Sequence, residues 1–197
     1  HGRNAWTFTA RSVMSTESDL VSAATAAVGS LKGPLHGGAP GPVLDMLRTV
    51  HQQGDPEGYV SETLAAGERL MGFGHRVYEV RDPRAAVLSE AAAEFYGDDD
   101  FFETVREFER VALECLAAHK PDRTLRTNVE FYTAALLHGI EVPQPLFTAT
   151  FAVSRVGGWM AHCLAQLDDN RLIRPVGRYV GETGRTFLVD RVTTPDG

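Results

Sequence analysis

Leu31-Lys32-Gly33-Pro34-Leu35-His36-Gly37-Gly38-Ala39 joins two segments whose apolar residues repeat at helical spacing. The first segment, residues 20–31, follows Thr16-Glu17-Ser18-Asp19, a string of the capping-box type that predicts a helix start. The second segment, residues 43–50, is ended by Gly54. Glycines in the joining stretch allow unusual backbone angles and let another group approach the backbone closely. The stretch therefore predicts a helix-loop-helix with a histidine in the loop.

The rest of the chain continues as one helical segment after another. Asp55-Pro56 and Asp82-Pro83 each combine an N-cap residue with a proline at the first helical position. Gly97 ends the helix that Asp82-Pro83 begins, and the run 97–100, with three aspartates after the glycine, is typical of a solvated turn. Apolar spacing predicts further helices at residues 101–116, 128–138 and 146–167. Only the tail, around 179–180 and 187–189, is typical of extended chain, so the sequence predicts an all-α protein.

Composition narrows the class of protein. A net charge of −7 argues against a general nucleic-acid or anionic-membrane surface. No apolar run is long enough for a transmembrane helix. The two cysteines, Cys115 and Cys163, form no CxxC, which favours a reducing, cytoplasmic location over a disulfide framework. No HxxxH motif or Cys/His cluster occurs, so no metal site is expected. The chain begins at His1 rather than methionine, and we expect it to be part of a longer protein.

His36 is the first candidate for chemistry, because it lies between Pro34 and a Gly-Gly pair. A neutral imidazole in such a loop donates a hydrogen bond to a carbonyl oxygen. That bond strengthens as the carbonyl becomes an enol or enolate. The alternative is a helix C-terminal loop with an incidental histidine, and a bare Leu-His-Gly-Gly string does not separate the two.

The second candidate is the string Met71-Gly72-Phe73-Gly74-His75-Arg76-Val77-Tyr78. A dinucleotide-binding turn is excluded, since Val77 stands where GxGxxG needs glycine and no strand signal precedes it. A turn that offers backbone amides and carbonyls to a ligand fits better. Arg84 follows at a helix N-terminus, where anions are favoured, and its guanidinium is suited to a carboxylate. A surface salt bridge is the alternative for Arg84 alone.

Glu130 is the third candidate, in Asn128-Val129-Glu130-Phe131-Tyr132. Apolar neighbours in a short helix predict partial burial, which raises the pKa of a carboxyl and improves it as a base near neutral pH. A half-exposed helix glutamate is the commoner alternative.

In this order the three strings closely resemble the C-terminal half of citrate synthase, along nearly the whole chain. The resemblance implies that His36 holds the thioester carbonyl of acetyl-CoA and that His75 polarises the ketone of oxaloacetate. It implies that Glu130 removes a proton from the methyl group of acetyl-CoA, in a Claisen-type condensation. The residues that the resemblance implies for binding oxaloacetate carboxylates are His1, Arg84, Arg155 and Arg174, the last reaching into the partner subunit of a homodimer. Those expected to bind the CoA co-substrate are Leu70, Met71, Gly72, Phe73, Gly74, Asn128, Arg123 and Arg126.

The resemblance also implies two helical domains around an active-site cleft. Residues 41–146 correspond to the small domain, while residues 1–40 and 147–197 correspond to parts of the large domain. Acetyl-CoA is then a co-substrate, and no permanently bound cofactor or metal is expected. The loop that carries Arg123 and Arg126 has a second interpretation, an ordinary solvated loop.

Three departures from the family pattern affect the functional prediction. Most family members have aspartate at the position of Glu130. The family often has a basic residue at the position of Glu79, and it usually has a small residue at the position of Trp6. A shift of about one ångström in a carboxylate costs on the order of 10²-fold in rate unless the backbone compensates. Two alternatives to citrate synthase therefore stay open. One is a 2-methylcitrate synthase that uses propionyl-CoA, and the other is a catalytically weak CoA- or dicarboxylate-binding protein with a regulatory role.

Overall fold

The computed structural model describes residues 4–34, 37–74 and 82–184. This part of the chain folds into eight α-helices and one 3-10 helix, without a strand, so the prediction of an all-α protein is confirmed. The elements are α1 (Ala5–Met14), α2 (Leu20–Leu31), α3 (Pro40–Gln53), α4 (Pro56–Ala65), α5 (Pro83–Tyr96), α6 (Asp100–His119), α7 (Val129–Gly139), η1 (Gln144–Leu146) and α8 (Phe147–Leu167).

The helix starts follow the sequence signals closely. Asp55 and Asp82 each accept a hydrogen bond from a backbone N–H of the first turn, with proline next in the chain, as predicted. Asn128 does the same for α7. Each such cap satisfies a donor that the first turn leaves without a helical partner and is worth about 1 kcal/mol. Gly54, at φ 67°, ends α3 in the left-handed conformation that glycine adopts easily.

One expectation about helix starts was wrong. The cap of α2 is Asp19, which accepts from the Ser22 N–H at 2.8 Å, and not Thr16. The Thr16 hydroxyl instead donates back to the carbonyl of Val13 at the end of α1, a helix that the sequence analysis did not predict. The acidic run after Gly97 is exposed, as expected, but it is more than a turn. Asp99 within it caps α6 by accepting from two backbone N–H groups.

The loop after α2 is closed by a hydrogen bond from the Gly38 N–H to the Gly33 carbonyl, 3.1 Å long. A Cβ at Gly38 would lie 2.5 Å from the carbonyl oxygen of Lys32, so only glycine fits there. The Gly-Gly pair is therefore needed for the chain to turn from α2 into α3.

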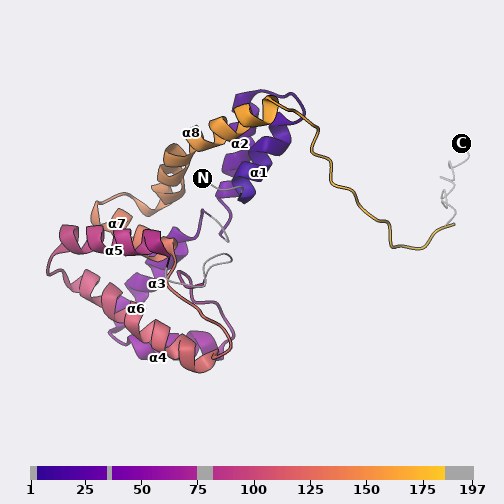
Figure 1. Ribbon diagram of the computed structural model, residues 1–197. Coiled ribbons are helices and arrows are strands. Elements are labelled where there is room, and N and C mark those ends of the chain that lie inside the picture. The colour runs from indigo at the N-terminus through magenta and orange to yellow at the C-terminus, as the bar shows by residue number, and fades with distance from the viewer. Residues whose placement is uncertain (1–3, 35–36, 75–81, 185–197) are drawn as a thin grey trace, which may run out of the picture.

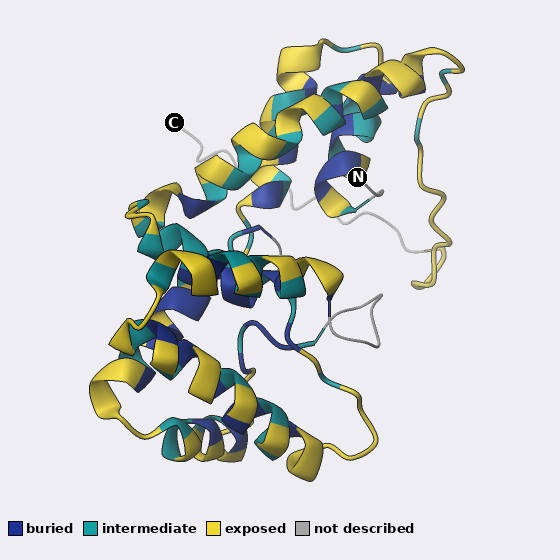
Figure 2. Ribbon diagram, turned by 60° about the vertical axis from the view of Figure 1, so that its left-hand side comes forward, coloured by how far each residue is buried: buried dark blue, intermediate teal, exposed yellow. Residues whose placement is uncertain are grey.

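Two hydrophobic clusters hold the helices together. The α3–α7 cluster is built from α3, α4, α5, α6 and α7 with the connecting residues Leu70 and Phe73, and Phe147 at the start of α8 joins it. The α1–α2–α8 cluster packs Trp6, Met14 and Leu31 against Trp159. Figure 1 shows the two groups of helices one above the other, and Figure 2 shows the buried residues on the faces that the helices turn toward each other. The long helix α8 runs from one group into the other.

The described chain after α8 is extended, as predicted for residues 179–180, and it runs away from the helices in Figure 1; residues 187–189 lie outside the described residues. Its side chains are largely exposed, Val176 almost completely. Two hydrogen bonds tie its start to Ser15, the C-cap residue of α1. The Asn170 side chain donates to the Ser15 carbonyl, and the Ile173 N–H donates to the Ser15 hydroxyl.

Candidate active site

The start of α7 is fixed by a pairing between two loops. The Asn128 N–H donates to the Gly72 carbonyl at 2.9 Å, and the Gly74 N–H donates to the Arg126 carbonyl at 2.7 Å. Asn128 also uses its side chain twice, since Nδ2 donates to the Gly74 carbonyl and Oδ1 accepts from the Glu130 N–H, both at 3.0 Å. Asn128 thus sets the position of Glu130 relative to the turn at residues 70–74.

Gly72 and Gly74 make this turn possible. Their φ angles are 86° and 84°, in the left-handed region that other residues rarely adopt. A Cβ at Gly72 would also lie 2.9 Å from the Phe131 ring, in the same helix as Glu130. The side chains of Leu70 and Phe73 lie in the α3–α7 cluster. The turn therefore presents backbone rather than these side chains on its open side.

Glu130 lies in the first turn of α7, and its Oε2 atom is buried without a hydrogen-bond partner among the described residues. Burial raises the pKa of its carboxyl from 4.5 to about 7. The positive charges of Arg84 and Arg155 lower this pKa, and the negative charge of Asp82 raises it. The expectation of a raised pKa for Glu130 is therefore confirmed, with burial as the largest cause.

Arg84 is held by Asp82, its neighbour two residues earlier at the start of α5. One carboxylate oxygen of Asp82 accepts from the Arg84 backbone N–H and from Nε, both at 3.0 Å. The other accepts from Nη2 at 2.7 Å, which completes a bidentate pair. The Asp82 side chain is 1% exposed and that of Arg84 is 48% exposed. The Asp82 carboxylate is therefore buried in the protein. It fixes the orientation of the Arg84 guanidinium, which is partly exposed at the surface.

Arg155, on α8, lies over the faces of two aromatic rings. Its guanidinium carbon lies 5.3 Å from the centre of the Trp6 ring and 5.0 Å from the centre of the Phe151 ring. Its Nε is buried and has no hydrogen-bond partner in the described part of the chain. Burial lowers the pKa of Arg155, the positive charge of Arg84 lowers it further, and the negative charge of Glu130 raises it.

Glu130, Arg84 and Arg155 thus influence one another electrostatically, although they come from three helices. Two cations that disfavour each other's charge form a site for an anion with more than one charge. A carboxyl with a pKa near 7 beside them is suited to take up and release a proton at neutral pH. The arrangement is able to remove a proton from a bound ligand while the arginines hold carboxylates.

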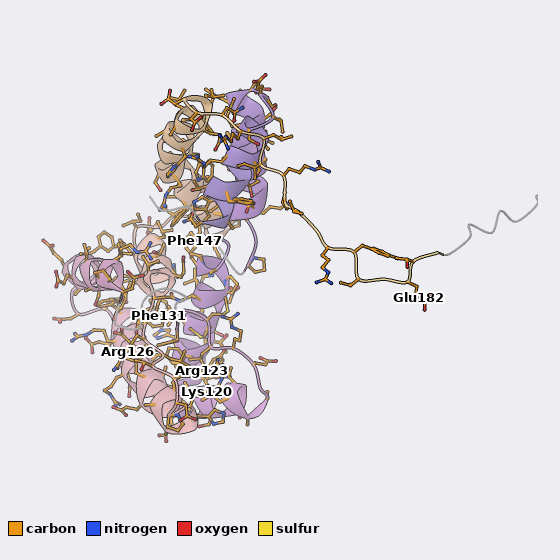
Figure 3. All side chains as sticks on the ribbon, turned by 45° about the vertical axis from the view of Figure 1, so that its right-hand side comes forward. Lys120, Arg123, Arg126, Phe131, Phe147 and Glu182 are labelled. Atoms are coloured by element: carbon orange, nitrogen blue, oxygen red, sulfur yellow. The ribbon has the colours of Figure 1, made fainter. Side chains whose placement is uncertain are left out.

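Other predicted residues lie apart from this group or outside the described residues. Arg123 and Arg126 are exposed on the loop before α7, and Figure 3 shows them below Phe131, on the side away from α8. Arg174 lies on the exposed extended segment, whose far part Figure 3 marks with Glu182. The remaining candidates, His1, His36, His75 and the departure Glu79, lie outside the described residues.

Two contributors to the site escaped the sequence analysis. Asp82 was assigned only as a helix cap, although an arginine two residues after a capping aspartate was a signal for the ion pair. Phe151 was not singled out, and its place one turn before Arg155 was the available signal.

No group of His, Cys, Asp or Glu that is able to hold a metal ion occurs within the described ranges. None of the described helices has the length and apolar content to cross a membrane.

Comparison with known proteins identifies the family. Residues 1–176 match the family described as "Citrate synthase, C-terminal domain". The citrate synthase of Haloferax volcanii is 48% identical over 95% of this chain and 48% of its own length, and the 2-methylcitrate synthase of Shewanella oneidensis is 40% identical over 95% and 49%. The Thermoplasma acidophilum citrate synthase, solved in a ternary complex with carboxymethyl coenzyme A and oxaloacetate, has a TM-score of 0.85 at 32% identity, covering 96% of this chain and 51% of its own.

The chain belongs to the citrate synthase family. The family resemblance inferred from the histidine and carboxylate strings is therefore confirmed. The chain spans about half the length of the curated relatives it matches.

Proposed function

We propose that this chain provides the C-terminal part of a citrate synthase, which condenses acetyl-CoA with oxaloacetate to give citrate and CoA. The observation that carries the proposal is Glu130, a buried carboxyl with a pKa raised to about 7, under the influence of Arg84 and Arg155. A base for this reaction needs a pKa near the working pH, and a dicarboxylate needs cations beside it. The family membership supplies the reaction class.

In this mechanism ionised Glu130 takes a proton from the methyl carbon of acetyl-CoA. His36 donates a hydrogen bond to the thioester oxygen as the enolate forms. The enolate carbon attacks the ketone carbon of oxaloacetate, which His75 polarises, and the ketone oxygen takes up a proton. Water then hydrolyses the citryl thioester, releasing citrate and the CoA thiol. Arg84 and Arg155 hold carboxylates of oxaloacetate throughout, together with His1 and an Arg174 contributed across a homodimer.

The CoA part of the co-substrate is assigned to the turn at residues 70–74, Asn128, and the exposed Arg123 and Arg126. Support comes from the left-handed glycines, which leave a backbone surface at the turn.

We also propose a small domain at residues 41–146 and large-domain segments at 1–40 and 147–197. The two hydrophobic clusters support that division. The protein is assigned to the cytoplasm as a homodimer.

A 2-methylcitrate synthase is the second candidate, favoured by the 40% identity to the Shewanella oneidensis enzyme. The two reactions share every step and differ by one methylene in the acyl chain. One methylene in a pocket is worth about 1–3 kcal/mol, so the acyl preference has to be measured.

Release of free thiol tests both candidates. The full-length protein that contains this chain is assayed with oxaloacetate and either acetyl-CoA or propionyl-CoA, beside Glu130→Gln and the control Glu62→Gln, which removes an exposed carboxylate from α4. Oxaloacetate-dependent release that falls at least about 10²-fold in Glu130→Gln, and stays unchanged in Glu62→Gln, establishes Glu130 as the base. The faster thioester identifies the acyl chain. No release with either thioester refutes the synthase and leaves a binding or regulatory relative.

A further inference from the structure

Arg155 differs from Arg84 in the way it is held. Arg84 is gripped at one edge of its guanidinium by the Asp82 carboxylate. For Arg155, the contacts that define its position are the faces of two aromatic rings, Trp6 at 5.3 Å and Phe151 at 5.0 Å. The two rings themselves are 5.6 Å apart and inclined at 52°. They form a wedge against which the planar guanidinium rests.

This wedge is rigid on the side of Trp6. Trp6 is 5% exposed and packs in the α1–α2–α8 cluster with Ala10, Met14 and Leu31. Phe151 is partly buried against the same cluster and lies on α8, one turn before Arg155. A guanidinium held over two ring faces loses freedom to move, while its N–H donors remain able to bind an acceptor. An aliphatic or hydroxyl residue in place of Trp6 offers no such face.

The N–H groups of the Arg155 guanidinium also require a hydrogen-bond acceptor. Its Nε is buried without a hydrogen-bond acceptor among the described residues, and burial and Arg84 both disfavour its charge. A buried donor on a cation is costly until an acceptor reaches it. A planar carboxylate satisfies such an edge with parallel hydrogen bonds.

We propose that Trp6 and Phe151 are positioning residues, which hold the Arg155 guanidinium over their ring faces so that its N–H groups meet a carboxylate of the dicarboxylate co-substrate. This inference rests on the proposed function, because oxaloacetate is the ligand in question. It gives a role to Trp6, at a position where the family pattern has a small residue. It also makes Trp6 a reporter of binding, since its ring touches the cation that the ligand contacts.

The first experiment uses the fluorescence of Trp6. The chain has two tryptophans, so the variant Trp159→Phe leaves Trp6 as the only one. Titrating this variant with oxaloacetate is expected to change its emission in a saturable way, while acetate, with a single carboxylate, does not at the same concentrations. No change in Trp6 emission at oxaloacetate concentrations that saturate binding, measured by calorimetry, overturns the proposal.

The second experiment separates positioning from packing. Trp6→Ser removes the ring and is expected to raise both the Kd and the KM for oxaloacetate on the order of tenfold, with the KM for acetyl-CoA unchanged. Trp6→Phe retains a ring face and is expected to recover most of this loss. Trp159→Phe, a substitution in the same cluster that retains an aromatic ring, is the packing control and is expected to change neither constant. If Trp6→Ser does not fold, as judged by circular dichroism, Phe151→Leu removes the other ring and takes its place.

The outcomes distinguish this inference from the proposed function. Trp6-dependent binding of oxaloacetate without any thiol release supports the positioning role and refutes the synthase. Normal thiol release with unchanged oxaloacetate constants in Trp6→Ser refutes the positioning role and leaves the synthase standing. Equal losses in Trp6→Ser and Trp159→Phe, or equal increases in both substrate KM values, show a merely structural role and also refute it.

Discussion

Glu130→Gln is expected to stabilise the protein at alkaline pH, and the size of the effect follows from burial. The glutamine amide resembles the protonated carboxyl in shape and carries no charge. Raising the pKa of Glu130 from 4.5 to about 7 corresponds to a cost of about 3 kcal/mol for ionising the buried carboxyl in the folded protein. That figure already includes the favourable charges of Arg84 and Arg155.

The pH dependence has a definite sign. Below about pH 4.5 both folded and unfolded protein hold the proton, so Glu130 contributes no difference. Between 4.5 and about 7 only the folded protein holds it, and stability falls as the pH rises. Above about pH 7 the folded protein carries the buried charge, and the full cost of about 3 kcal/mol applies. A protein without this carboxyl avoids that loss.

Urea unfolding at about pH 4.5 and about pH 8 measures the effect. Comparing the variant with the natural protein at each pH removes the contribution of all other titrating groups. Glu130→Gln is expected to match the natural protein at the lower pH and to exceed it by about 3 kcal/mol at the higher pH. The exposed control Glu62→Gln is expected to show no such pH-dependent gain. A gain of equal size at both pH values, or a loss at pH 8, would refute the reasoning.

Two further substitutions test the geometry around the site. Asp82→Asn keeps a helix cap but removes a buried charge, so it is expected to lower the free energy of unfolding by about 2 kcal/mol, against less than about 1 kcal/mol for Asp55→Asn at the other Asp-Pro cap. Because Asp82 raises the pKa of Glu130, the acid limb of the pH–rate profile is expected to move to lower pH in Asp82→Asn, and a shift to higher pH would contradict this. Gly72→Ala combines a left-handed φ with a side-chain overlap and is expected to cost about 2–4 kcal/mol by thermal melting. Gly67→Ala, at a φ of 72° in open space, is its control and is expected to cost about 1 kcal/mol; equal costs would show that the overlap is relieved.

Most of the fold could be predicted from local signals. Asp-Pro pairs begin α4 and α5, and Gly54 and Gly97 end α3 and α5, because capping and left-handed turns depend on a few neighbouring residues. Where two local signals competed, the prediction failed. The hydroxyl of Thr16 bonds to the helix before it, so Asp19 takes the cap of α2.

The candidate site could be predicted only in part. The chemistry of Glu130 and Arg84 was visible in their neighbours along the chain. The approach of Arg155 to both, and its contact with the ring of Trp6 about 150 residues earlier, depends on tertiary packing that no local pattern encodes. The same holds for the Gly72 turn, whose need for glycine comes from the Phe131 ring as well as from its φ.

The candidate site draws on both hydrophobic clusters. Glu130 stands on α7 in the α3–α7 cluster, while Arg155 rests on Trp6 and Phe151 in the α1–α2–α8 cluster. A dicarboxylate held by Arg84 and Arg155 therefore links the two clusters, so that the stability of each depends on the other. In a calorimeter such a ligand acts on cooperativity as well as on Tm, because the clusters then lose their structure together in a single heat-absorption peak.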